Sequence, residues 1–308
     1  MTEISHRLAH VRLGEPQSHG RLTMFPVLNG GGAEPRYPTL REALARGTVA
    51  IEEVTDAGSV PRLAVRNDGD VPVLLLDGEE LVGAKQNRVV NVSILVPAKT
   101  TLAIPVSCVE QGRWHYRTRR FGDSDQAIFS EARRRNHRDV EQNLKQRGVR
   151  EADQGRVWND IRRKMASMGS ESPTGAMHDV YAQSADSLRR YHDAFRPIDG
   201  QVGALFLLAG AWCGLDLFEA PSSLGAMFPK LLNSWALDAL EPRPEASTAS
   251  TRSRAEDFLA AVARAKQLDY PAVGLGRELR LEGEDVVGAA LMHDGSVVHL
   301  AAFERGGA

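Results

Sequence analysis

Several features that would place this sequence in a class are scarce or missing. Its two cysteines, Cys108 and Cys213, are too few for a disulfide framework and are typical of a reducing compartment. The most apolar run, residues 202–218, is interrupted by glycines and an aspartate and is too short to cross a membrane. The N-terminus lacks the basic and apolar pattern of a secretory signal. These absences predict a cytoplasmic protein with no membrane partner.

Strong charge, metal motifs and phosphate loops are also missing. A formal net charge of -2 disfavours nucleic acid as a partner of the whole chain. The nine histidines form neither an HExxH motif nor a quartet with cysteine, so no metal site is expected. The glycine-rich loop NGGG at 29–32 is not followed by the GK[ST] of a phosphate loop, and Ser107 lacks the GxSxG frame of a hydrolase. The sequence therefore names no cofactor, and it leaves oligomerisation open.

The overall composition is typical of a globular fold, with 42% hydrophobic and 25% charged residues. Short strand-like runs follow one another between residues 50 and 108 with no room for a helix, so their pairing is predicted to be antiparallel. Helical periodicity takes over between residues 126 and 195. The predicted fold is α+β, with mostly antiparallel sheets in a sandwich-like arrangement, a central helical insertion and a C-terminal β-hairpin.

Changes in composition divide the chain into four segments. A polar, flexible arm at 1–20 precedes an α+β domain at 21–240. A linker rich in Pro, Ser and Thr at 241–252 precedes a helix plus β-hairpin at 253–308, which is expected to pack on the main domain. Residues 126–147 are arginine-rich with few apolar positions, which predicts a helix that packs weakly or lies mostly in solvent.

Two distant parts of the chain resemble each other. LLLDGEELVGA at 74–84 is similar to LRLEGEDVVGA at 279–289. We favour convergence on the same strand–turn–strand chemistry, and a duplicated β unit is the alternative. The second copy is not followed by the KQN that follows the first, so it is expected to be structural.

Polar and ionisable residues are unusually dense among the strands of residues 74–114. Burying them unpaired would be strongly unfavourable, so their clustering predicts a site. Cations there would hold phosphate or carboxylate, amides would read polar edges, and an indole would stack on a base. The candidate ligand-binding residues are Lys85, Gln86, Asn87, Arg88, Asn91, Arg113 and Trp114. The expected partner is a small anionic ligand such as a nucleotide, and the alternative is a salt-bridged turn with a structural role.

Four residues in this segment are candidates for catalysis. Glu79, Glu80 and Glu110 would serve as general acids or bases. Cys108 ends a strand, and it would be a nucleophile if a nearby histidine or cation lowered its pKa. The alternative for Cys108 is a small core residue. These residues leave undecided whether the protein is an enzyme.

The same segment carries a resemblance to a known family. The strings that carry it are GEELVGAKQNRVVN, IPVSCVEQGRW and, upstream, LTMFPVL and YPTLREALARGTVAIEEV. They resemble the ARPP-1 domain, the ARG and rhodanese-phosphatase-superfamily-associated protein family, over roughly residues 20–240. The resemblance implies ADP-ribose or NAD-linked chemistry, by association with ADP-ribosylglycohydrolases and rhodanese-like phosphatases. It implies no catalytic residues, so the candidates above come from their chemistry alone.

Three functions follow from these observations. The leading one is a protein that binds an ADP-ribose or NAD-type nucleotide, with or without processing it. The second is a non-catalytic interaction module, with a rigid polar turn network and an arginine-rich partner surface at 126–147. The third is a hydrolase or transferase that depends on Cys108.

Overall fold

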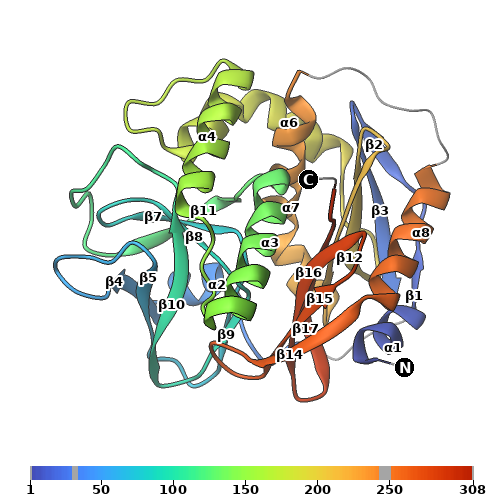
Figure 1. Ribbon diagram of the computed structural model, residues 1–308, viewed down its shortest axis with the longest axis horizontal. Coiled ribbons are helices and arrows are strands. Elements are labelled where there is room, and N and C mark those ends of the chain that lie inside the picture. Colours follow the sequence, from blue (N-terminus) through green and yellow to red (C-terminus); the bar gives the residue numbers. More distant parts are fainter. Residues whose placement is uncertain (1, 30–33, 243–250, 307–308) are drawn as a thin grey trace. The chain divides into compact units, whose positions relative to one another are not determined.

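The structure is a computed structural model that describes residues 2–29, 34–242 and 251–306 (Figure 1). Two sequence predictions fall on other residues. The glycine loop at 29–32 is described only at Asn29, and most of the linker expected at 241–252 lies outside the described residues. The chain divides into two compact units, each with a hydrophobic core of its own.

Unit 1 comprises residues 1–35, 186–272 and 276–308 and is built on one antiparallel sheet of nine strands. Its strands are β1 (Val11–Leu13), β2 (Gln17–His19), β3 (Leu22–Asn29), β12 (Gln201–Leu208), β13 (Trp212–Phe218), β14 (Lys266–Pro271), β15 (Arg277–Glu282), β16 (Val286–His293) and β17 (Ser296–Glu304). They are ordered β1-β3-β12-β13-β17-β16-β15-β14, and β2 pairs with β3.

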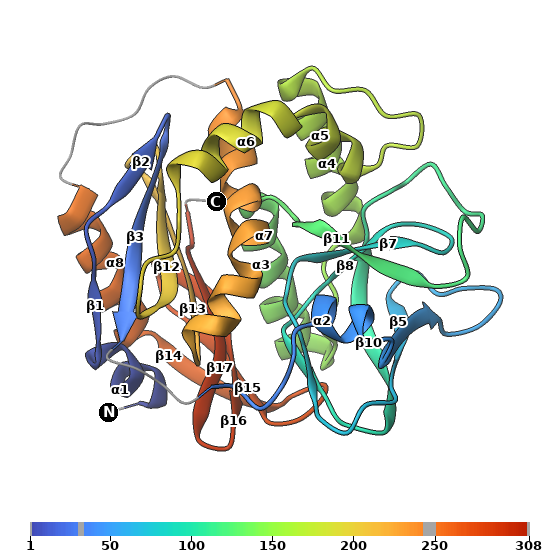
Figure 2. The ribbon, with the colours of Figure 1, turned by 180° about the vertical axis from the view of Figure 1, so that it is seen from behind.

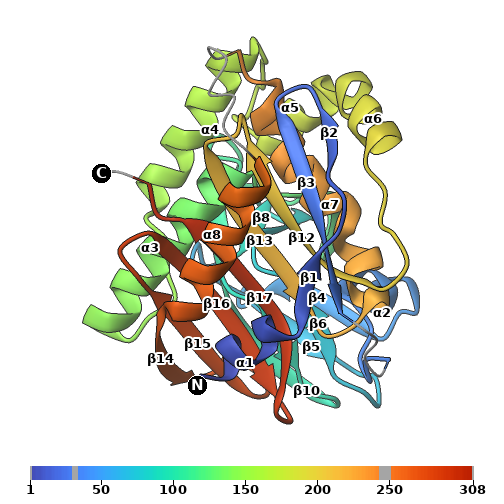
Figure 3. The same ribbon diagram turned by 90° about the vertical axis from the view of Figure 1, so that its right-hand side faces the viewer.

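Helices cover both faces of this sheet. They are α1 (Glu3–Ala9), α6 (Ala185–Ala194), α7 (Pro221–Leu240) and α8 (Thr251–Arg264). Ile4 of α1 and Phe258 of α8 join the core on one face, and Figure 3 shows these two helices together in front of the sheet. On the other face Trp235 of α7 stacks on Phe206 of β12, with ring centroids 5.4 Å apart. In Figure 2 the sheet accordingly lies between α8 and α7.

Residues 2–19 form one helix and two strands of unit 1, where the sequence predicted a flexible arm at 1–20. Thr2 caps α1 by accepting a hydrogen bond from the Ser5 N–H at 3.2 Å. Ile4 and Leu8, one helical turn apart, are buried. β1 and β2 then both pair with β3. Such short elements give little periodicity in the sequence, and their order comes from packing on the sheet.

Unit 2 comprises residues 36–185 and 273–275 and contains a closed antiparallel barrel. The barrel strands are β4 (Val49–Glu53), β5 (Arg62–Asn67), β7 (Glu79–Gly83), β8 (Arg88–Val90), β10 (Thr100–Cys108) and β11 (Phe121–Ala127). They close in the order β10-β5-β4-β11-β7-β8. A separate ribbon pairs β6 (Val73–Leu75) with β9 (Ile94–Val96).

Four helices belong to unit 2: α2 (Leu40–Ala45), α3 (Ser130–Arg147), α4 (Gln154–Met168) and α5 (Met177–Gln183). The expectation that the arginine-rich helix packs weakly is wrong. α3 buries Val140 and Leu144, and it also buries the polar side chains of Arg133 and His137. Both polar side chains bond to Asp77, at 2.7 and 2.8 Å respectively. A polar helix face can be buried when its charged groups find buried partners of opposite charge.

The predicted fold class is confirmed. The fold is α+β with antiparallel strand ladders, and α3–α6 are inserted between β11 and β12. The C-terminal hairpin pairs β16 with β17, and its turn places Asp294 and Gly295 at positive φ of 48° and 76°. None of the helices in the described part of the chain has both the length and the apolar character needed to cross a bilayer.

Candidate functional site

The turn between β7 and β8 carries the polar motif, and its backbone requires glycine. Gly83 has φ of 126°, and a Cβ there would lie 2.5 Å from Thr118 Oγ1 and 2.7 Å from the Arg120 carbonyl. Ala84 follows at φ of 35°, also in the left-handed region. These two residues reverse the chain, and the next four, residues 85–88, are buried. The motif is therefore an internal feature of unit 2.

Arg113 is the centre of this buried network, with only 1% of its side chain exposed. One terminal nitrogen donates to Glu110 at 2.6 Å and to the Asn87 amide oxygen at 3.1 Å. The other donates to the carbonyls of Ala84 and His115. A buried guanidinium is tolerated only with such pairing, so Arg113 ties together the two segments that the sequence singled out.

Glu110 is the carboxylate partner of Arg113 and is fully buried. It also accepts hydrogen bonds from the Asn87 N–H at 3.1 Å and from Thr174 Oγ1 at 2.9 Å. Burial raises the pKa of Glu110, but the hydrogen bonds from Arg113, Asn87 and Thr174 outweigh it and hold the pKa below its usual value. Glu110 is thus a stable anion and a poor proton donor.

Glu80 forms a pair with a histidine that is reachable from solvent. Its carboxylate accepts from Ser124 Oγ at 2.8 Å and lies 3.1 Å from His178 Nδ1. The hydrogen bond to Glu80 raises the pKa of His178, and partial burial opposes that rise. His178 is 44% exposed, while Glu80 is fully buried and its Oε1 has no hydrogen-bond partner. This geometry is that of an acid–base pair.

Sequence reasoning missed His178 as a functional residue. It lies 98 residues from Glu80 in the chain and on α5, in the region where the sequence showed only helical periodicity. Its only signal was its adjacency to Asp179, and neighbouring residues point different ways on a helix. Only the folding of α5 against the barrel brings it to Glu80.

Gln86, Arg88 and Cys108 form a second buried group. Arg88 Nη1 donates to Gln86 Oε1 at 2.8 Å, and Cys108 Sγ lies 3.1 Å from the same oxygen. Burial raises the pKa of Cys108, and the positive charge of Arg88 only partly opposes it. A fully buried thiol with a raised pKa lacks the thiolate that nucleophilic chemistry needs.

Lys85 joins this network to an exposed aromatic surface. Its ammonium donates to the carbonyls of Asp56 and Ala57 at 2.6 and 2.9 Å. It also lies 5.4 Å from the ring centroid of Trp114 and 5.1 Å from that of Tyr116. Trp114, whose ring centroid is 5.7 Å from the Arg88 guanidinium, is 47% exposed. The rings of Trp114 and Tyr116 therefore pack against cationic side chains and are partly exposed to solvent.

Two predicted site residues lie outside this network. Asn91 accepts from Ser107 Oγ at 2.8 Å and donates to the Arg150 carbonyl at 3.0 Å. Glu79 accepts from the Leu76 N–H at 2.6 Å. Both side chains are buried and bond to nearby structural groups, so they hold the backbone around the cluster.

Several buried polar atoms of unit 2 have no hydrogen-bond partner. They include both carboxylate oxygens of Glu53, Oε1 of Glu80, Nε and Nη2 of Arg88, Nε of Arg113 and Nε1 of Trp158. Burial without a partner costs on the order of 1–3 kcal/mol per group, more for charged ones. Native structures contain few such atoms, and those of Glu80, Arg88 and Arg113 belong to the polar network described above. That concentration identifies the network as the candidate site of unit 2.

Comparison with known proteins yields one match. The family model of the ARG and Rhodanese-Phosphatase-superfamily-associated Protein domain, ARPP-1, matches residues 10–303. No curated protein and no solved structure matches the chain. The match covers both units and every candidate site residue, which extends the resemblance seen in the sequence motifs.

Proposed function

This chain belongs to the ARPP-1 domain family, and we propose that its unit 2 binds a nucleotide of the ADP-ribose or NAD type. The binding surface is the exposed loop at residues 114–120 together with the Lys85 turn beneath it. One observation carries the proposal: Trp114 is a half-exposed indole that lies against two cationic side chains, Lys85 and Arg88.

The aromatic part of the surface suits a nucleobase. Trp114 and Tyr116 are two of the exposed large hydrophobic side chains of the described residues. Base stacking on an aromatic side chain contributes about 1–3 kcal/mol per base, and it needs an accessible ring face. The cations beneath Trp114 fix the ring without covering its exposed part.

The basic part of the surface suits a pyrophosphate. Lys85 and Arg88 already donate to protein oxygens, so the phosphates go to the arginines of the exposed loop. Arg117 has no ion pair within the described residues. Arg119 faces Asp56 at 3.7 Å, but both side chains are more than four-fifths exposed, and such a pair is weak. Arginine forks bind phosphate oxygens in pairs.

Processing of the bound nucleotide would use the Glu80–His178 pair. The hydrogen bond to Glu80 raises the pKa of His178 and so favours the protonated ring, which can donate a proton to a leaving group. Glu80 orients the ring and stabilises its positive charge. The reaction class that fits is hydrolysis with general-acid assistance. Cys108 takes no part in it.

Calorimetric titration with ADP-ribose, NAD and AMP tests the binding. We expect heat with at least one of them, and we expect Trp114→Ala to weaken that affinity at least about fivefold through lost stacking. Trp212→Ala is the matched control, because Trp212 is a similarly exposed tryptophan of β13 in unit 1. Absence of heat with all three ligands at millimolar concentration would remove the proposal.

A non-catalytic interaction module is the second candidate function, because most hydrogen-bond donors of the polar motif already have acceptors within the protein. Lys85 holds the chain at Asp56 and Ala57, as a structural turn network requires. Lys85→Ala separates the two functions. A network with only a structural role predicts a lower melting temperature and no nucleotide affinity in either protein. The binding proposal predicts that the native protein binds and that the variant binds less tightly.

A further inference from the structure

A polar cavity of about 350 Å³ lies in unit 2, between the helices α3 and α4. All eight of its lining residues are polar. The charged ones are Arg135, Arg138 and Asp139 of α3 and Arg156, Asp160 and Arg163 of α4. The cavity shares no residue with the nucleotide surface proposed above. We propose that it binds a sugar phosphate, a phosphate monoester on a small hydroxylated body.

Ion pairs between the two helices hold the sides of this cavity together. Arg156 Nη2 lies 2.6 Å from Asp139 Oδ2 and donates to Asn136 Oδ1 at 2.5 Å. Arg135 pairs with one oxygen of Asp160, and Arg156 Nη1 donates to the other at 2.5 Å. These charge-assisted bonds fix the spacing of α3 and α4, so the cavity is formed before a ligand arrives.

The two remaining arginines of the lining have no carboxylate partner among the described residues. Arg138 is half-buried and makes no hydrogen bond or ion pair with any described residue. Arg163 has a neutral partner, because the Asn159 amide oxygen, in the orientation that satisfies that amide, accepts from Arg163 Nη2 at 2.7 Å. Even when Glu131, which pairs with Arg135 from outside the lining, is included, four guanidiniums face three carboxylates. The cavity therefore carries an excess of positive charge.

The chemistry and the size of the lining favour a phosphate on a hydroxylated body. A guanidinium fork binds phosphate oxygens through paired hydrogen bonds. The side-chain amides of Gln142 and Asn159 offer donors and acceptors, which suit sugar hydroxyls. At roughly 30 Å³ per water-sized group, the volume holds about twelve such groups. That is close to the size of a pentose or hexose phosphate and far more than a bare phosphate ion needs.

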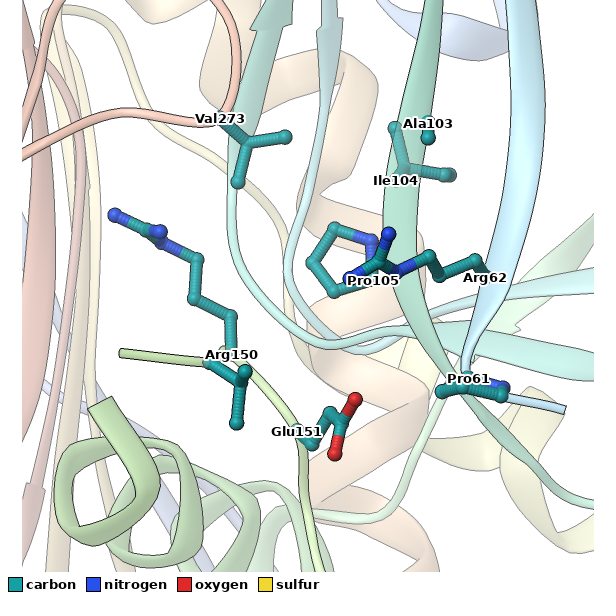
Figure 4. Close-up of a pocket in the computed structure, with 9 residues that line it drawn as sticks. Pro61, Arg62, Ala103, Ile104, Pro105, Arg150, Glu151 and Val273 are labelled. Atoms are coloured by element: carbon teal, nitrogen blue, oxygen red, sulfur yellow. The ribbon is translucent and has the colours of Figure 1, made fainter. Parts of the chain in front are cut away.

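A second cavity of unit 2, drawn in Figure 4, lacks the properties that a sugar phosphate needs. It measures about 280 Å³, and six of its nine lining residues are apolar, among them Pro61, Pro105 and Val273. Figure 4 shows the Arg150 side chain running away from Arg62, so the two guanidiniums do not face a common point. Hydroxyl groups buried against apolar walls would lose hydrogen bonds to water without replacement. The cavity between α3 and α4 is the better match.

Calorimetric titration of the full chain with glucose 6-phosphate tests the proposal. We expect binding at millimolar concentration or below, and at least about tenfold weaker binding of glucose and of inorganic phosphate, since each offers only one part of the ligand. Arg163→Ala should weaken glucose 6-phosphate binding at least about tenfold and leave the melting temperature unchanged, because Arg163 is exposed. Arg162→Ala is the matched control, because it removes the same charge from the neighbouring exposed position of α4, outside the lining.

Four results would overturn the proposal. They are no heat with glucose 6-phosphate, equal binding of glucose or inorganic phosphate, equal losses in Arg162→Ala and Arg163→Ala, and a loss in Trp114→Ala. Equal losses in the two arginine variants would indicate general charge attraction. A loss in Trp114→Ala would place the sugar phosphate on the nucleotide surface, because Trp114 and its loop lie outside this cavity. Failure of the nucleotide titration would leave the sugar phosphate site unaffected for the same reason.

Discussion

Residues 74–84 and 279–289 have similar sequences but different structures. The first segment joins β6 to β7 in unit 2, and these two strands do not pair with each other. The second forms the antiparallel hairpin of β15 and β16 in unit 1. Gly78 of the first turn has a positive φ of 83°, whereas the equivalent Gly283 lies outside that region. Two different turns from one pattern support convergence over duplication.

The difference that matters for function is the burial of the acidic residues. Glu79 and Glu80 of the first segment are fully buried, whereas their counterparts Glu284 and Asp285 are exposed. Similar acidic pairs therefore give a buried carboxylate next to His178 in one unit and an exposed hairpin turn in the other. Charge in a turn indicates a site only where the surrounding fold buries it.

Asp77→Ala should have the largest effect. It removes the buried carboxylate shared by Arg133 and His137, and breaking a buried pair costs about 3–5 kcal/mol of unfolding free energy. The matched change Glu282→Ala removes a half-exposed partner of Lys266 and should cost about 0–1 kcal/mol. Urea unfolding measures both. Equal losses would show that the two turns are equivalent after all.

Gly78→Ala should have a moderate effect and Gly283→Ala almost none. Alanine at a left-handed position costs about 1–2 kcal/mol, and at residue 78 its Cβ would also lie 3.1 Å from Arg133 Cδ. At residue 283 the nearest atom is Val286 Cβ at 3.6 Å, an ordinary contact. Thermal unfolding of the two variants checks the difference. A Gly283→Ala variant as unstable as Gly78→Ala would contradict the assigned turn conformations.

Glu80→Gln should change the pH dependence of stability by a smaller amount. The pKa of His178 is raised in the folded protein by its pairing with Glu80. The stability that this pairing contributes is therefore fully present below the unfolded pKa of about 6.5, and it is lost as the pH rises through the folded pKa. The difference in unfolding free energy between native protein and variant should therefore be wider at about pH 6 than at about pH 9. Asp285→Asn is the matched control and should show no such trend. A stability difference that does not change with pH would show that Glu80 does not raise the pKa of His178.

The smallest effect is expected for alkylation of the two cysteines, because neither thiol should react in the native protein. Burial raises the pKa of Cys108, and in unit 1 it raises the pKa of Cys213 to about 12. Both thiols should resist iodoacetamide at neutral pH in the native protein and react fully in urea. Rapid native labelling of Cys108 with an inert Cys213 would restore the cysteine-dependent hydrolase or transferase.

The strands and the position of the polar network could be predicted from the sequence. Alternating apolar residues and frequent turn residues predicted the antiparallel strands, and the density of polar groups around Lys85 and Cys108 pointed to the network that folds around Arg113. The N-terminal elements were missed because α1 and its neighbouring strands are too short to show periodicity. The burial of α3 was missed because its partner Asp77 lies 56 residues from Arg133.

The sequence by itself determined the α+β class, the family and the segment in which the chemistry is concentrated, because strand alternation, turn residues and motifs are local properties of the chain. Only the tertiary structure decided which side chains share a site. It turned the KQNR motif inward, brought His178 to Glu80 and left Trp114 partly exposed against Lys85 and Arg88. Those pairings depend on how the barrel closes and on which charges can be neutralised once water is excluded, and neither can be read from spacing along the chain.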